Sequence, residues 1–269
     1  METEPPKAEP PKRKRRWFQF SLRTLLGLTL LVGLGMATWI VPIKKSAEKQ
    51  KVAVDAIKTD AGSVFYDYQV DPSGSLTTGA EPPGPSWLRR LLGDDFFSTV
   101  VGVGVNTPAD MKHVGELSKL RTIGAYGVPI SDADLKGVRE LSQLTTLNLS
   151  RTPVTDAGLR NLKGLSQLED LELSGTRVTD LGLKQLSGLS QLKSLDLNAT
   201  RITDAGLESL GGLSHLQDLT LSQTSVTDAG LKHLKELTEL QTLSLWKTKV
   251  TDAGVKDLQK ALPNCKISR

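Results

Sequence analysis

The chain has 269 residues but only one cysteine, three histidines and few aromatic residues, which make up 4% of the sequence. The single cysteine, Cys265, excludes an intramolecular disulfide, so packing has to stabilise the fold. His113, His215 and His233 do not share a neighbouring Cys or Asp set at a metal-binding spacing. We therefore expect no metal site and no cofactor.

Sequence motifs for catalysis are also lacking. There is no G-x-S-x-G, no phosphate-binding Gly loop before a helix, and no H-E-x-x-H or C-x-x-C. The serine that recurs in Leu-Ser-Gln is part of a repeated pattern rather than a nucleophile. We predict that the protein is not an enzyme.

Basic charge is confined to one end of the chain. Residues 1–23 carry a net charge of +4, and the whole chain also carries +4, so residues 24–269 are neutral. This distribution gives no support for a nucleic-acid-binding domain. The KRKRR cluster at 12–16 lies directly before an apolar run, which favours a membrane-topology signal. The alternative is a nuclear-localisation or nucleic-acid-binding patch.

The dominant pattern is a period of 24 residues over 120–263, which contains six rows beginning at Leu120. The clearest row is LTTLNLSRTPVTDAGLRNLKGLSQ at 144–167, and the row at 120 is degenerate. A fixed period in the range of about 20–29 residues that opens with L-x-x-L-x-L is typical of a stacked-repeat solenoid.

Each row predicts a short strand, a tight turn and a short helix, because the apolar spacing changes from two to three residues within the row. One row cannot bury its own leucines, so neighbouring rows bury each other's. The fold class is therefore α/β: a solenoid with a curved parallel sheet inside and short helices outside, preceded by one transmembrane helix. Six strands at about 4.8 Å spacing give a concave strip roughly 25–30 Å long.

Three polar or small columns recur along the rows. The Thr of T-D-A-G-L should cap each helix and its Asp should suit the helix dipole, with a metal ladder of stacked carboxylates as the alternative. We expect a second Thr column to tie neighbouring turns together, and the Gly column to allow close packing between helix and turn. The second Thr column is Thr152, Thr176, Thr200, Thr224 and Thr248, and the Gly column is Gly158, Gly182, Gly206, Gly230 and Gly254.

Alternation along each strand should turn the third, fifth, seventh and eighth row positions towards the concave face. The apolar positions repeat from row to row, whereas the side chains at these four positions vary. The middle of the predicted face is acidic, and Trp246 could act as an aromatic anchor for a partner. The alternatives are an ordinary solvated surface and a Ca²⁺ site, which chelator-insensitive thermal stability would dismiss. The predicted partner-binding residues are Tyr126, Asn148, Arg151, Asp170, Glu172, Asp196, Asn198, Asp218, Trp246 and Lys247.

Residues 24–43 form an uncharged stretch of 20 residues, which at about 1.5 Å per residue spans a bilayer core. The basic tail at 1–23 favours a cytoplasmic N-terminus, so we expect an uncleaved signal-anchor with the repeats on the exported side. A cleaved signal peptide is the alternative. Membrane contact is therefore predicted through this span.

The segments that flank the repeats are less regular. Residues 44–95 predict a juxtamembrane helix over 46–60, a short strand in SVFYDYQV and a helix over 86–92, which should shield the open core of the first repeat. A membrane-surface helix is the alternative for 86–92. Residues 96–119 predict a degenerate N-terminal capping repeat, and 264–269 the C-terminal cap.

These rows resemble the leucine-rich repeat family, and V-T-D-A-G-L resembles its ribonuclease-inhibitor-like and cysteine-containing subclass, also found in F-box substrate adaptors. The order of basic tail, apolar span, flanking segment and repeats resembles bacterial single-pass membrane-anchored repeat proteins. The resemblance implies a protein-binding solenoid without chemistry. The chain lacks an F-box before its repeats, which removes the sequence basis for a ubiquitin-ligase role.

Taken together, these patterns predict a non-catalytic protein–protein or ligand interaction module that is anchored in the membrane and binds through the concave face of its solenoid. The sequence does not name the partner. Two alternatives stay open: an envelope scaffold or spacer without a dedicated ligand, and an intracellular adaptor.

Overall fold

The computed structural model describes residues 22–71, 75–77 and 79–269, without the side chains of 22–37 and 39. It divides into two compact units, Met1–Ile43 and Lys44–Arg269. The predicted tail at 1–23 lies almost wholly outside the described residues.

Helix α1 (Leu22–Thr59) begins in the first unit and continues into the second. It is helical over the whole predicted span 24–43 and through the predicted juxtamembrane helix, so both predicted segments belong to one continuous helix. Among the described residues, no helix is long and apolar enough to cross a membrane. The span at 24–43 stays a prediction from the sequence.

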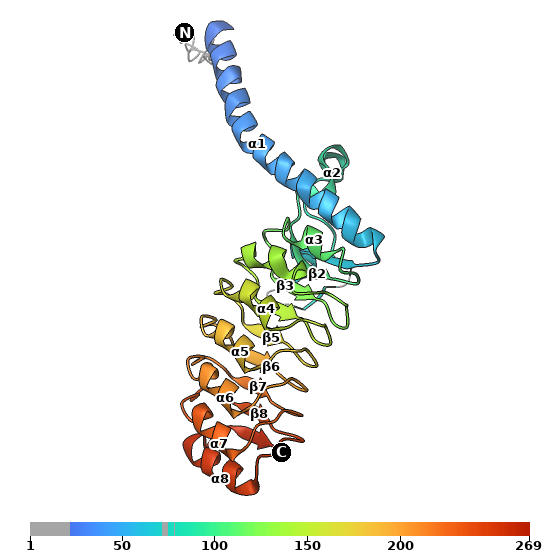
Figure 1. Cartoon of the computed structure of the whole chain (residues 1–269). Helices are drawn as coiled ribbons and strands as arrows, with labels where there is room; N and C mark the ends of the chain where they lie inside the picture. Colours follow the sequence, from blue (N-terminus) through green and yellow to red (C-terminus); the bar gives the residue numbers. More distant parts are fainter. Residues whose placement is uncertain (1–21, 72–74, 78) are drawn as a thin grey trace, which may run out of the picture. The chain divides into compact units, whose positions relative to one another are not determined.

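The second unit is built on one sheet of nine strands that lie in sequence order (Figure 1). β1 is antiparallel to β2, and all later neighbours are parallel. The strands are β1 (Ser63–Tyr66), β2 (Val100–Gly104), β3 (Thr122–Gly124), β4 (Thr146–Asn148), β5 (Asp170–Glu172), β6 (Ser194–Asp196), β7 (Asp218–Thr220), β8 (Thr242–Ser244) and β9 (Lys266–Ser268). The register from β3 to β9 advances by one row at each step, as in Leu147 beside Leu171, so the predicted α/β solenoid is confirmed.

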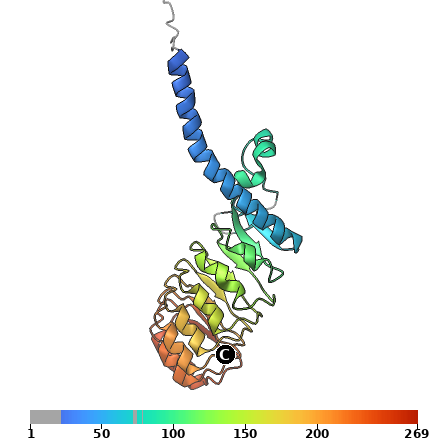
Figure 2. The same cartoon turned by 45° about the horizontal axis from the view of Figure 1, so that its top comes forward.

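Short helices form the outer layer on one side of this sheet (Figures 1 and 2). Each regular row has one α-helical turn followed by a 3₁₀ turn, which suits leucines spaced by three residues. The α-helical turns are α4 (Asp156–Leu159), α5 (Asp180–Leu183), α6 (Asp204–Leu207) and α7 (Asp228–Leu231), and the 3₁₀ turns are η4 (Arg160–Leu162), η5 (Lys184–Leu186), η6 (Glu208–Leu210) and η7 (Lys232–Leu234). The first row has only a 3₁₀ helix, η3 (Asp134–Glu140).

The core is a continuous column of leucine between the sheet and the outer helices. In the second row, the seven apolar positions that the period singles out are all 0% exposed: Leu144, Leu147, Leu149, Val154, Leu159, Leu162 and Leu165. Each row completes the burial of the next, as expected of a solenoid.

The N-terminal end of this core is closed by α1 and β1 rather than by the helix over 86–92. Ala53, Val54 and Ile57 of α1 are buried in the same core cluster as the strand residues. In contrast, α2 (Ser86–Leu92) contains no buried residue, so its predicted role as the shield is wrong. Burial by α1 leaves no open leucine surface for α2 to cover.

The residues around these elements complete the cap. β1 is shorter than the predicted strand, because η1 (Asp67–Gln69) follows it directly. Next to α2 comes η2 (Asp94–Phe96), and then β2 and α3 (Met111–Val114) form the irregular row that was predicted over 96–119. β2 pairs in parallel with β3, so this row extends the array.

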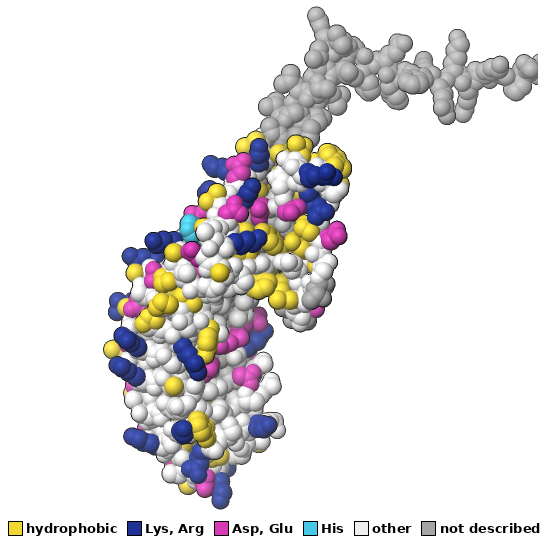
Figure 3. Space-filling model, turned by 90° about the vertical axis from the view of Figure 1, so that its right-hand side faces the viewer, with side chains coloured by type: hydrophobic (Ala, Val, Ile, Leu, Met, Phe, Trp, Pro, Cys, Tyr) yellow, Lys and Arg dark blue, Asp and Glu magenta, His cyan; other side chains and the backbone are white. Residues whose placement is uncertain are grey.

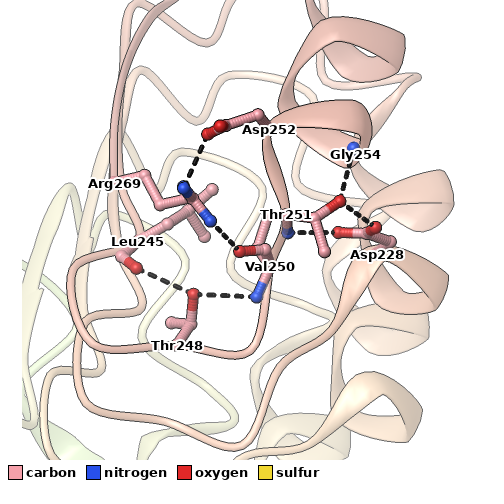
Figure 4. Close-up of polar contacts among 8 residues, drawn as sticks. All are labelled: Asp228, Leu245, Thr248, Val250, Thr251, Asp252, Gly254 and Arg269. Atoms are coloured by element: carbon pink, nitrogen blue, oxygen red, sulfur yellow. Dashed lines mark hydrogen bonds and ion pairs between the residues drawn. The ribbon is translucent and has the colours of Figure 1, made fainter.

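At the other end, α8 (Asp252–Ala261) is longer than the earlier outer helices, and β9 completes the sheet. Cys265 lies buried just before β9. The Arg269 guanidinium donates to the Val250 carbonyl at 2.7 Å and pairs with Asp252 at 2.6 Å (Figure 4). These contacts fix the last residue of the chain against the last row.

An Asp–Thr ladder connects the rows on the helix side. Each Thr caps its own helix as predicted, since Ala157 N donates to Thr155 Oγ1 at 3.2 Å. The Asp of the preceding row, however, accepts both the backbone N–H and the hydroxyl of that Thr at 2.6–2.8 Å. Figure 4 shows one rung, in which Asp228 holds Thr251. The ladder pairs are Asp132–Thr155, Asp156–Thr179, Asp180–Thr203, Asp204–Thr227 and Asp228–Thr251.

The second Thr column does not tie neighbouring turns together, so that prediction is wrong. Thr176 Oγ1 donates to the Leu173 carbonyl at 2.7 Å, three residues earlier in the same row, and Thr200 repeats this contact with Leu197. The turn after each strand brings this carbonyl within reach of the hydroxyl. These buried hydroxyls therefore close the turn of their own row.

Candidate functional site

The third and fifth row positions form two columns on the strand side of the sheet. In β5 the middle residue, Leu171, is buried, while Asp170 and Glu172 on either side of it are half-buried. The other strands from β3 to β8 have the same alternation, which is the pattern expected when one face of a strand packs on the core. These columns form the exposed concave face.

Four carboxylates lie on three consecutive strands of this face. Asp170 and Glu172 are on β5, Asp196 is on β6 directly beside Glu172, and Asp218 is on β7. We call these four residues the acidic patch. Figure 3 shows acidic side chains gathered over the middle of the solenoid. The sequence had placed them on neighbouring strands, and the register confirms that placement.

Only neutral groups of the described residues hydrogen-bond to the acidic patch. Asn148 Nδ2 donates to Glu172 at 2.6 Å, the Asn198 backbone N–H donates to Asp196 at 2.7 Å, and Thr242 donates to Asp218. None of the ion pairs in the described part of the chain includes a patch carboxylate. The negative charge of the patch is thus not neutralised by the surrounding fold.

Burial and mutual repulsion perturb three of these carboxyl groups. Burial, together with the charges of Asp218 and Asp196, raises the pKa of Asp170. Burial, with the charges of Asp170 and Asp196, also raises the pKa of Glu172, and burial raises that of Asp196. A raised carboxyl pKa means that the charged form is disfavoured where it stands, so a cation placed near the patch would be favoured.

Aromatic and cationic side chains flank the acidic patch on both sides. Before it, the Arg151 guanidinium carbon lies 5.3 Å from the centre of the Tyr126 ring. After it, Lys247 Nζ lies 4.0 Å from the centre of the Trp246 ring. Tyr126 is 56% and Trp246 50% exposed, so both rings are accessible for contact with another molecule.

Position eight of each row has a backbone property that the sequence did not reveal. All six residues at this position have positive φ: Gly127, Arg151, Gly175, Ala199, Gln223 and Lys247. This left-handed conformation turns the chain after each strand, and it favours glycine. The two glycines in the column are the signal that was available in the sequence.

The seventh position is less uniform than predicted. Ser150 and Ser222 are buried rather than turned out to solvent, while Tyr126 and Trp246 are exposed. Ser174 and Asn198, the other two residues at this position, are half-buried. The Asn198 side chain contacts the preceding row, because its Nδ2 donates to Ser174 Oγ at 3.0 Å.

A groove of about 1060 Å³ lies beside the acidic patch at the N-terminal end of the array. Its apolar walls include Phe65, Val70 and Val101, and its polar lining includes Arg121 and Glu169. Because one wall comes from the non-repeating segment around β1, the row pattern gave no sign of it. The groove also includes third-position residues of β3 and β4, so it is continuous with the columns that lead to the patch.

No group of three or more His, Cys, Asp or Glu side chains in the described part of the chain is arranged to hold a metal ion. The ladder carboxylates each engage a Thr of the next row, as described above. The concave face presents charge, hydrogen-bonding groups and aromatic rings.

Comparison with known proteins agrees with this geometry. Residues 142–202 match the family model described as "Leucine rich repeat". The match places leucine-rich repeats at these residues, and the rows on either side of them share the same 24-residue period. Leucine-rich repeat proteins are typically protein-interaction modules, and no curated protein matches this chain.

Three solved structures are similar to about 60% of the chain. Internalin C2 from Listeria monocytogenes is 28% identical, with a TM-score of 0.52 over 64% of this chain and 70% of that chain. A leucine-rich repeat protein from Leptospira interrogans is 21% identical, with a TM-score of 0.45 over 59% of this chain and 45% of that chain. Another internalin from Listeria monocytogenes is 19% identical, with a TM-score of 0.38 over 61% of this chain and 57% of that chain.

Proposed function

We propose that the protein is a non-catalytic binding module whose concave face takes a basic segment of a polypeptide partner. The observation that carries this proposal is the acidic patch, in which Asp170, Glu172 and Asp196 are half-buried and no carboxylate has a cationic partner among the described residues. The charges of Asp196 and Asp218 also act against that of Asp170. Lys or Arg side chains of a partner would relieve this repulsion and be steered towards the patch.

The remaining concave features suit the same kind of partner. The groove beside β1 can receive an apolar side chain, and Trp246 at the far end offers an aromatic anchor of the type that dominates interfaces. An extended segment that crosses the strands would contact the groove, the patch and Trp246 in turn. The ten residues predicted from the sequence belong to this proposed surface.

The location of the module is part of the proposal and rests on the sequence alone. Residues 24–43 would anchor the chain as a single membrane pass, with the N-terminus in the cytoplasm and the repeats on the exported side. The ribonuclease-inhibitor-like subclass likewise rests on the V-T-D-A-G-L phrase. A partner would then be met in the cell envelope.

Binding of a fluorescent Lys-Ser repeat peptide to the full chain in detergent tests the proposal, with a Glu-Ser peptide as the ligand control. We expect salt-sensitive binding of the basic peptide that D170N/E172Q/D196N/D218N weakens at least about tenfold, which corresponds to about 1.4 kcal/mol. The matched control is D55N/E116Q/E208Q/E236Q, which removes the same charge from exposed positions elsewhere. Equal loss in both variants, or no loss in the first, would contradict a role for the patch.

A further inference from the structure

The helix α2 exposes an apolar face that the fold does not use. Trp87 is 64% and Leu91 73% exposed, and their spacing of four residues places them on the same side of the helix. Leu88 and Leu92, each one residue further along the helix and so about 100° around it, are half-buried. Contact with the protein thus covers only part of the apolar surface of the helix, and Trp87 and Leu91 remain exposed.

This exposed face is held in place by a hydrogen-bonded network around Gln50 of α1. Gln50 Nε2 donates to Asp95 at 3.0 Å and to the Ser98 carbonyl at 2.9 Å, and its Oε1 accepts the Val100 N–H at 3.0 Å. Tyr66 donates its hydroxyl to Asp95 at 3.2 Å. The segment that follows α2 is thus tied to both α1 and the first strands, and α2 lies beside this part of α1 in both views (Figures 1 and 2).

The surface around α2 carries more basic than acidic side chains, although Asp94 pairs with Arg89 at 4.0 Å and Glu81 is exposed before the helix. Arg90 is exposed on α2, and four exposed lysines lie on α1 close to Gln50, namely Lys44, Lys45, Lys49 and Lys51. Glu48, which pairs with Lys44 at 4.0 Å, is the one acidic residue among them. Exposed Trp and Leu together with surplus Lys and Arg are the chemistry of a protein face that binds an anionic bilayer surface.

The part of α1 that holds the segment after α2 follows the proposed membrane span closely in sequence. Gln50 follows the last residue of that span, Ile43, by seven residues of the same helix, which is about 10 Å at 1.5 Å per residue. The interfacial layer on each side of a bilayer core is roughly 5–8 Å thick. If the span crosses the bilayer, Gln50 therefore lies within a few ångströms of the outer edge of the headgroup layer along the chain.

We propose that α2 docks on the bilayer surface, with Trp87 and Leu91 inserted at the boundary between headgroups and acyl chains. Arg90 and the α1 lysines would meet anionic headgroups, and Trp is a side chain that prefers this boundary. This docking rests on the anchoring proposed above. It would fix the orientation of the solenoid relative to the membrane by adding a second point of attachment to the span.

Fluorescence quenching in vesicles tests the docking. The full chain carrying Cys265→Ser and Leu91→Cys is labelled with a small fluorophore and reconstituted into vesicles of phosphatidylcholine and phosphatidylglycerol. The matched control is Leu181→Cys, because Leu181 on α5 is also an exposed leucine, at 63%. We expect lipid-borne quenchers to act several-fold more strongly at position 91 than at position 181, and iodide to act more weakly there.

The outcomes separate docking from anchoring. Equal iodide quenching at both positions, in protein that resists alkaline extraction from the vesicles, would overturn docking and leave the anchor intact. Extraction of the protein by alkali would refute the anchor itself, and docking with it. If position 91 is shielded in detergent and the shielding increases with protein concentration, a second copy of the chain covers the face and the proposal is overturned.

Discussion

Replacing Gly206 with Ala should test whether the Asp–Thr ladder holds the rows together. Gly206 lies in α6, where alanine alone would be favoured over glycine by about 1 kcal/mol. A Cβ at this position, however, would lie inside van der Waals contact with Asp180 Oδ1, and 3.2 Å from Ile202 Cγ2. The Asp180 carboxylate would have to move away, and it would then lose its hydrogen bonds to Thr203.

The size of the effect follows from those two bonds. The Thr203 N–H and hydroxyl lie 2.8 and 2.6 Å from Asp180 oxygens, and each such bond at a partly exposed site contributes about 1 kcal/mol. Asp180→Ala should therefore destabilise the chain by about 2 kcal/mol. We expect Gly206→Ala to lower the free energy of unfolding by a similar amount. Strain destabilises the variant by about 1 kcal/mol more, and the higher helix propensity of alanine offsets about as much.

The double variant D180A/G206A gives the decisive comparison. Once the Asp180 carboxylate is absent, the new methyl group at position 206 meets only Ile202 closely. The higher helix propensity of alanine then stabilises the fold, so the double variant should be more stable than D180A. Urea unfolding followed by circular dichroism measures this, with Gly212→Ala as the control because a Cβ there meets nothing within 4 Å. Additive destabilisation, within about 0.5 kcal/mol, would refute the steric role of the glycine column.

Two further predictions concern the turn after β6 and the acidic patch. Ala199, at φ 53°, should gain up to about 1 kcal/mol of stability when replaced by Gly, whereas Ala205→Gly in α6 should lose about 1 kcal/mol; thermal melts of the two variants should shift in opposite directions. Because the pKa values of Asp170, Glu172 and Asp196 are raised in the folded state, the folded chain binds more protons just above their ordinary values of 3.8 and 4.5, and stability from this source rises as pH falls through that window. D170N/E172Q/D196N should therefore be more stable than the wild type at neutral pH and should lose this pH dependence, as thermal melts across the window would show.

The repeat period predicted the sheet, its register and its core, because each of these depends on local spacing. Leucines two apart belong to a strand and leucines three apart to a helical turn, so the row alone defines which side chains are buried. Stacking then repeats the same solution along the array. For the same reason the acidic patch was predictable: once the register is one row per strand, Glu172 must lie beside Asp196.

Contacts between specific polar groups were not predictable from spacing. Asp156 suits both the dipole of its own helix and the Thr179 of the next row, and only the distance between rows decides that it bonds the latter. The prediction for the second Thr column was wrong because each hydroxyl bonds a carbonyl within its own row. Thr176, for example, donates to the Leu173 carbonyl three residues earlier. The prediction that α2 shields the first repeat was wrong because α1 and α2 both have an apolar stripe. The sequence does not show which of the two stripes faces the core.

The two faces of the array separate stability from recognition. On the helix side, each ladder Asp has a Thr partner in the next row, so removing it weakens the stack. On the strand side, Asp170, Glu172 and Asp196 make the folded state less favourable at neutral pH, because burial raises the pKa of each of these carboxyl groups. Side chains that reduce stability in the isolated fold are expected where another molecule compensates for them. The same chemical group therefore has opposite consequences on the two faces, and amide substitutions in the patch can test binding without unfolding the chain.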